Sequence, residues 1–105
     1  MAPLESQMKF YLCKYIPPRA DFRASMTGDE REWMRQHGAF LDELLDRGLI
    51  VAHGPVMDPS GGYGLSLFRI GDDQDIKAIT SQDPIVRNGA GHYEHHPMLH
   101  LSVHG

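Results

Sequence analysis

One histidine of this chain falls on the apolar face of a predicted helix, where its ionisable ring must point toward the core. Steps of three and four, which match the 3.6-residue period of a helix, separate the residues of this face: Trp33, His37, Phe40, Leu41, Leu44 and Leu45. A buried imidazole must be hydrogen-bonded or held neutral. His37 is therefore either a core residue that donates to a backbone carbonyl or one half of a site for general acid-base catalysis.

A second group of candidates lies near the end of the chain, where histidines alternate with other residues. An unbroken strand would place five of these side chains on one face, since they share one parity: His92, Glu94, His96, His100 and His104. Imidazoles and carboxylates are ligands of zinc and nickel. The i, i+2 spacing is a loose signal, and Pro97 interrupts it, so adventitious metal binding is favoured over a functional metal site.

Composition restricts the classes of protein to which the chain can belong. The 105 residues suffice for one domain, 1–105, with loose termini at 1–7 and 101–105, and 41% hydrophobic with 23% charged residues is typical of a globular protein. A net charge of −4, with ten Lys and Arg that form no block, argues against a nucleic-acid partner. The sequence has neither a signal-peptide core nor an apolar run of the ~18 residues that a spanning helix needs, so we expect a soluble, cytoplasmic protein without a membrane partner.

Motifs for covalent or cofactor chemistry are not found in the sequence. It has no serine nucleophile motif, no phosphate-binding glycine loop and no dinucleotide fingerprint, and the glycines of 61–64 read as a turn because no helix follows them. We therefore expect no cofactor. The single cysteine, Cys13, lies in an apolar segment and is predicted to be a small buried hydrophobic residue.

Segments of strand and helix composition alternate along the chain. The helix that carries His37 begins with a capping box at Thr27 and Glu30, and Asp83 before Pro84 is typical of the start of a further helical turn. The stretch 17–26 reads as a loop that retains one large apolar residue, Phe22. The predicted elements are strand 8–16, helix 28–47, strand 49–52, strand 63–70, helix 72–81, one or two helical turns in 83–89, and strand 92–103.

The order strand, helix, strand, strand, helix, strand predicts an α+β fold. It corresponds to a ferredoxin-like βαββαβ sandwich, in which four antiparallel strands carry both helices on one face. The other face of such a sheet needs a cover, and in a chain of this size a second copy is the simplest one. We therefore expect a homodimer whose sheets pack face to face.

An ordered set of segments resembles the YCII-related family. The set covers most of the chain: MKFYLCKYI, PPRADF with MTGDE, MRQHGAFLDELLDRG, GPVMD, the Gly-rich turn with its strand, QDPIVRNG and YEHHPM. The resemblance implies a dimeric α+β barrel with a fold related to muconolactone isomerase. It also implies a site built around a histidine and an aspartate, and these family positions fall on His37 and Asp83, with a further aspartate at Asp58.

Each carried-over position also has a structural reading. The role of Asp83 as a helix N-cap explains it without chemistry, but a carboxylate held at a helix start can also orient an imidazole and stabilise its cation. Asp58 precedes Pro59 in a turn, where aspartate is common, and it is also a candidate substrate-binding residue, as is His53. Arg19 and Phe22 could form a lid with a carboxylate-binding charge, although an ordinary solvated loop is slightly favoured.

These residues support three functional hypotheses. The first is a cofactor-independent enzyme that transfers a proton next to a carbonyl, for isomerisation or elimination in a lactone-like or other small organic acid, with His37 as base or acid and Asp83 orienting it. The second is a non-catalytic small-molecule-binding or structural module of the same fold, and the third is a metal-binding protein that uses the C-terminal histidines.

Overall fold

The computed structural model describes residues 8–104 of the chain. The described elements follow the predicted order, with one additional short helix before the long one. The two separate helical segments expected in 72–81 and 83–89 are both present. They are β1 (Met8–Ile16), α1 (Phe22–Ser25), α2 (Gly28–Asp46), β2 (Ile50–Val56), β3 (Tyr63–Gly71), α3 (Ile76–Thr80), α4 (Pro84–Arg87) and β4 (His92–Met98).

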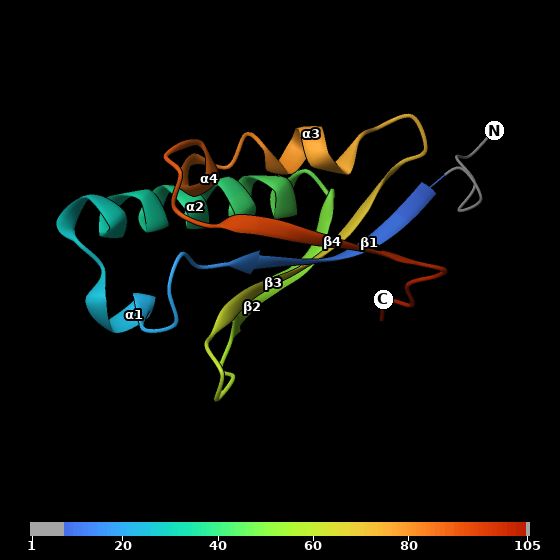
Figure 1. The fold of residues 1–105 in the computed structure, drawn as a ribbon. Coiled ribbons are helices and arrows are strands. Elements are labelled where there is room, and N and C mark those ends of the chain that lie inside the picture. The colour runs from blue at the N-terminus through green and yellow to red at the C-terminus, as the bar shows by residue number, and fades with distance from the viewer. Residues whose placement is uncertain (1–7, 105) are drawn as a thin grey trace.

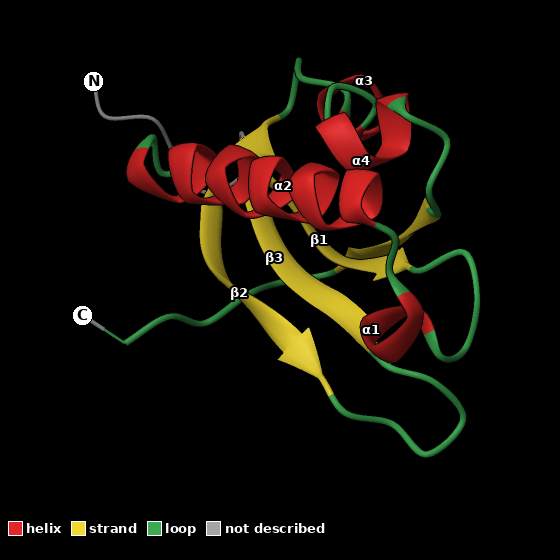
Figure 2. Cartoon of the chain, turned by 90° about the vertical axis from the view of Figure 1, so that its left-hand side faces the viewer, coloured by secondary structure: helices red, strands yellow, loops and turns green. Residues whose placement is uncertain are grey.

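The four strands form one antiparallel sheet in the order β2-β3-β1-β4. Helices α2, α3 and α4 lie on one side of this sheet (Figure 1), and α2 runs across the strands with α3 and α4 beside it (Figure 2). The predicted α+β fold with a βαββαβ order and helices on one face is therefore confirmed. The registers Cys13↔Ser66 and Tyr15↔Tyr93 identify the residues that share the helix-covered face of β1, β3 and β4.

Helix α2 begins where the capping box predicts. The Thr27 hydroxyl accepts from the Glu30 backbone N–H at 3.1 Å, and the Glu30 carboxylate accepts from the Thr27 backbone N–H at 2.9 Å. The helix buries His37, Leu41 and Leu44 against the sheet, as the apolar period predicts. The prediction is wrong for Leu45, which was expected on the same face and is 38% exposed. The capping box therefore fixes the start of the helix that delivers His37 to the interior.

The core beneath the helices divides into two clusters of buried side chains. One contains the fully buried Cys13 and Phe68, and burial raises the pKa of the Cys13 thiol to about 12, as expected for a small hydrophobic residue. The other surrounds Tyr15 and Ile85 near the N-terminal half of α2. Tyr93 packs against both clusters and so lies at the junction between them.

Two predicted strand boundaries are wrong. The strand expected over 49–52 does not end before Gly54 and Pro55, because β2 continues through both residues to Val56. Because β2 is an edge strand, one side of its backbone needs no sheet partner and a proline is tolerated there. The last strand ends at Met98 rather than at residue 103, because among residues 8–104 β4 pairs only with β1 and Met98 is the last residue in that pairing.

Two helical predictions also need correction. The stretch after β1 was expected to be a loop, but it contains the single turn α1, which buries Phe22. The helix predicted over 72–81 is shorter, since Asp75 caps it at the Lys77 backbone N–H and α3 spans only Ile76–Thr80. The expected loose terminus at 1–7 lies outside the described residues. Residues 99–104 contain no helix or strand.

Candidate functional site

His37 and Asp83 are in direct contact, although 46 positions separate them in the chain. The distance from His37 Nδ1 to Asp83 Oδ2 is 2.6 Å. The side chains are 8% and 0% exposed, respectively, so solvent screens the pair very little. The structure thus brings together the two residues that the resemblance assigns to one site.

The position of Asp83 follows from the short helix that it caps. Its Oδ1 accepts from the Ile85 backbone N–H at 3.1 Å, and Pro84 occupies the first helical position. This bond fixes one carboxylate oxygen and leaves Oδ2 directed at α2. Both readings of Asp83, N-cap and partner of His37, therefore hold in the same side chain.

Tyr93 is a third member of the site, and it was not predicted from the sequence. Its hydroxyl donates to Asp83 Oδ2 at 2.6 Å, so this oxygen receives both Tyr93 and His37. The alternation of side chains along a strand could have identified this residue. His92, Glu94 and His96 share one face of β4, so the residues between them, Tyr93 included, must face the helices. The predicted candidates on this strand were the histidines of the other face, so Tyr93 was not among them.

The aromatic ring of Tyr15 lies next to the imidazole on the sheet side. The Tyr15 ring lies 4.9 Å from the His37 ring between centroids, and the Tyr93 ring lies 5.9 Å from that of Tyr15. The Tyr15 hydroxyl donates to the Ala90 carbonyl at 2.5 Å rather than to Asp83. Burial, followed by the negative charge of Asp83, raises the pKa of both tyrosines well above the usual value, so both hydroxyls stay protonated donors.

The two imidazole nitrogens of His37 have different surroundings. The assignment that satisfies every group places a proton on Nδ1, because the Asp83 carboxylate also accepts from the Ile85 backbone N–H and from the Tyr93 hydroxyl. Nε2 has no hydrogen-bond partner in the described chain, and no buried side-chain nitrogen or oxygen of that part lacks one. Nε2 is therefore at least partly open to solvent and carries an unshared electron pair.

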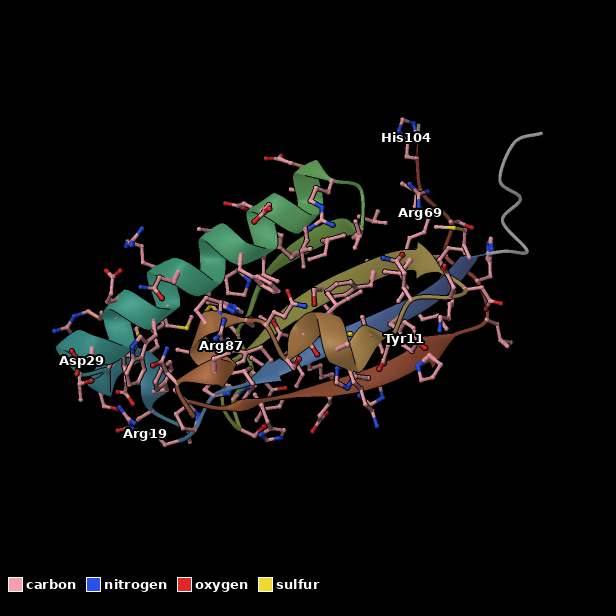
Figure 3. All side chains as sticks on the ribbon, turned by 90° about the horizontal axis from the view of Figure 1, so that it is seen from above. Tyr11, Arg19, Asp29, Arg69, Arg87 and His104 are labelled. Atoms are coloured by element: carbon pink, nitrogen blue, oxygen red, sulfur yellow. The ribbon has the colours of Figure 1, made fainter. Side chains whose placement is uncertain are left out.

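Arg19 does not reach the His37–Asp83 pair. Its guanidinium binds the Glu30 carboxylate through two hydrogen bonds, at 2.6 and 3.0 Å, and this ion pair holds the pKa of Glu30 at about 2. Figure 3 shows Arg19 beside the N-terminal end of α2, where Asp29 also lies. Phe22 is buried in the same cluster as Tyr15. The arginine of the expected lid is thus engaged by a protein carboxylate.

Asp58 and His53 also lie apart from the pair. Within the described chain, the hydrogen bonds of the Asp58 side chain go to the backbone N–H and hydroxyl of Ser60, at 2.9 and 2.7 Å, and they lower the pKa of Asp58. This is an aspartate turn between β2 and β3. His53 Nε2 lies 2.9 Å from Asp42 Oδ1, on β2 and α2. These contacts favour structural readings of both residues.

The C-terminal histidines do not form a cluster. Glu94 and His96 lie 3.5 Å apart on the face of β4 away from the helices, while His100 follows the end of the strand and binds Ser102. Figure 3 shows His104 far from Asp29 and the start of α2. The described residues contain no group of three or more His, Cys, Asp or Glu that could hold a metal ion.

A hollow of about 280 Å³ lies beside the C-terminal half of α2, against α3 and α4. Its walls include the apolar side chains of Phe40 and Ile79 and the guanidinium groups of Arg47 and Arg87. It touches neither His37 nor Asp83, although Phe40 is one helical turn from the former and Arg87 is four residues after the latter.

Fold and site together define an α+β protein with a buried His–Asp–Tyr group between a helix and an antiparallel sheet. The chain belongs to the YCII-related domain family, whose model matches residues 8–101. A comparison with curated proteins finds no match. Among solved structures, the chain is similar to a mutant of SnoaB, a cofactor-independent oxygenase from Streptomyces nogalater, with 10% identity, coverage of 92% of this chain and 96% of that one, and a TM-score of 0.47. At this level of similarity, no conclusion about chemistry follows.

The helices of the described chain are too short or too polar to cross a bilayer.

Proposed function

We propose that this protein is a cofactor-independent enzyme that uses His37 as an acid-base catalyst on a small organic substrate. The observation that carries the proposal is the 2.6 Å contact between His37 Nδ1 and Asp83 Oδ2, together with a second ring nitrogen that has no partner in the described chain. This arrangement presents a base at Nε2 and a carboxylate behind it.

The proposed reaction is proton transfer at a carbon next to a carbonyl. Nε2 of His37 takes the proton, and the electron pair of the broken C–H bond passes into the carbonyl as an enolate. The resulting imidazolium is stabilised by Asp83, which needs no proton of its own. Return of the proton at another carbon isomerises the substrate, and departure of a leaving group completes an elimination. A lactone or a small unsaturated acid has the carbonyl that this step requires.

The test follows hydrogen exchange, because exchange is detectable whatever product the reaction forms. A panel of small lactones and unsaturated or 2-oxo acids is incubated with the protein in D2O, and deuterium incorporation next to the carbonyl is measured by NMR. We expect incorporation with the unmodified protein and its loss in His37→Gln. His53→Gln is the matched control, since His53 also pairs with an aspartate, in its case Asp42 of α2. Incorporation that persists in His37→Gln would contradict the proposal.

A non-catalytic binding module is the second candidate. It is favoured by the burial of His37 and by the position of the 280 Å³ hollow, which does not touch the pair. Thermal stabilisation by members of the panel, without deuterium incorporation in any of them, would establish this candidate and exclude the enzyme.

We also propose that a second copy covers the open face of the sheet. By register, Leu12 and Leu67 lie opposite each other on this face, both half-buried, in the middle of the two central strands. Light scattering should give about twice the 11.8 kDa of one chain. Leu67→Lys should yield a monomer, while Leu45→Lys on the exposed side of α2 should not. A monomeric unmodified protein would refute the dimer.

A further inference from the structure

The carboxylate of Asp83 is held by two donors before His37 contributes. Its Oδ1 accepts from the Ile85 backbone N–H, and its Oδ2 accepts from the Tyr93 hydroxyl. Because the donors bind different oxygens, they fix the rotation of the carboxylate plane as well as its position. The N-cap bond alone would leave Oδ2 free to turn away from α2.

The hydroxyl of Tyr93 is itself fixed by packing. Tyr93 lies opposite Tyr15 in the register of β4 and β1, and its ring contacts Tyr15 edge-on and stacks with His95 at 6.1 Å between centroids. His95 is anchored in turn by the buried Thr80, whose Oγ1 lies 2.9 Å from His95 Nε2. The ring of Tyr93 thus has two aromatic neighbours, and its hydroxyl reaches Asp83.

We propose that Tyr93 is a positioning residue of the site: by holding Asp83 Oδ2 toward α2, it keeps the proton of His37 on Nδ1 and the electron pair on Nε2. The imidazole of a free histidine prefers the opposite tautomer, with its proton on Nε2. The site must therefore supply the free energy that favours the Nδ1–H tautomer. The catalytic meaning of this tautomer rests on the proposed function, but the tautomer itself is a property of the protein without substrate.

The test measures the tautomer directly. Long-range ¹H–¹⁵N correlation spectra of the ¹⁵N-labelled protein distinguish a protonated Nδ1 from a protonated Nε2. We expect His37 to be an Nδ1–H tautomer in the unmodified protein and a mixture of both tautomers in Tyr93→Phe. Tyr15→Phe is the matched control, because it also removes one hydroxyl next to the imidazole, but that hydroxyl binds the Ala90 carbonyl. We expect its His37 tautomer to be unchanged.

Two results would overturn the proposal. One is a pure Nδ1–H tautomer in a folded Tyr93→Phe, which would mean that Tyr93 only packs. The other is the same mixture of His37 tautomers in Tyr15→Phe as in Tyr93→Phe, which would mean that the loss of any hydroxyl near His37 disturbs its imidazole. If Tyr93→Phe does not fold, the unmodified protein in an equal mixture of H2O and D2O serves instead. Two donors that share one acceptor oxygen influence each other. The NMR signal of the His37 Nδ1 proton should therefore shift or split according to whether the Tyr93 hydroxyl carries H or D. An unaffected signal would refute the proposal that both groups donate to Asp83 Oδ2.

The outcome is separable from that of the proposed function. If a substrate is found by deuterium exchange, Tyr93→Phe should lower kcat by about ten- to hundredfold while KM changes little. If no substrate exchanges, the tautomer spectra still decide whether Tyr93 positions the pair.

Discussion

Helix α2 contributes to two His–Asp pairs that differ in almost every physical respect. His37 meets Asp83 through Nδ1 at 2.6 Å, with side chains 8% and 0% exposed. One turn further along the helix, Asp42 meets His53 through Nε2 at 2.9 Å, with the aspartate 69% exposed. The first pair is shielded from water, whereas in the second the carboxylate is open to solvent and the His53 side chain is 18% exposed.

The difference lies in how many other groups hold each carboxylate. Asp83 accepts from a backbone N–H and from Tyr93 besides the histidine, whereas the described hydrogen bonds of Asp42 go to His53 alone. A buried carboxylate with several donors is fixed in space, and a solvated one with a single partner is not. The comparison teaches that the pairing of residue types is a weak signal of function, and that the surrounding donors distinguish a candidate site from a surface contact.

The largest expected effect comes from removing each aspartate in turn. Asp83→Ala should lower the free energy of unfolding by about 3–5 kcal/mol, because it leaves His37 and Tyr93 without an acceptor in the interior and removes the N-cap of α4. Asp42→Ala should cost less than about 1 kcal/mol. Urea denaturation followed by circular dichroism measures both, and equal losses in the two variants would contradict the comparison.

A smaller effect is the pH dependence of the free energy of unfolding that arises from His95 of β4. Burial, followed by the positive charge of Lys77, lowers the pKa of His95 in the folded protein. As the pH falls below about 6.5, His95 is protonated in the unfolded chain before it is protonated in the folded protein. The contribution of His95 to stability is therefore complete above that pH and declines below it. His95→Gln removes this decline.

We expect the pH-dependent difference between His95→Gln and the unmodified protein to be roughly 0.5 kcal/mol, since solvent screens a partly exposed ring. Urea titrations at pH 7.5 and at pH 5 measure it. If the unmodified protein lost no more stability than His95→Gln between pH 7.5 and pH 5, protonation of the ring would not destabilise the folded protein and the prediction would be wrong.

The smallest expected effect is the response to salt. At a pH low enough to keep His53 protonated, the cost of Asp42→Ala should shrink by about 0.3 kcal/mol between 0.05 and 1 M NaCl, because ions screen an exposed ion pair. The cost of Asp83→Ala should not change measurably over the same range. If salt weakened both pairs alike, the buried pair would have to be open to the solvent.

Features that depend on neighbours in the sequence were predictable. The capping box at Thr27 and the apolar period of α2 are local, and the helix begins at Gly28 as they indicate. Strand β1 has the predicted bounds, Met8–Ile16, because prolines follow it directly. The end of β4 at Met98 was not predictable in this way, since it depends on where its partner β1 can pair.

The site was predictable in part, and for a similar reason. Helical period placed His37 in the interior, and the Asp-Pro step marked Asp83 as a cap. Their contact across 46 positions required the family resemblance, because nothing local connects α2 with α4. Tyr93 lies on the face of β4 that looks toward the helices, whereas the residue types typical of metal or acid-base chemistry, the histidines, lie mostly on the other face.

The place of β1 in the strand order has a consequence for how the molecule folds. Its neighbours are β3 and β4, so Phe10 pairs with Met98 and the sheet is not closed around β1 until the last strand is added. Such long-range pairing slows folding, and a growing chain exposes one edge of β1 meanwhile. The same strand brings Tyr93, so a chain that stops before residue 92 would have both an unpaired edge prone to aggregation and a carboxylate without its tyrosine. Completion of the sheet and completion of the site are one event.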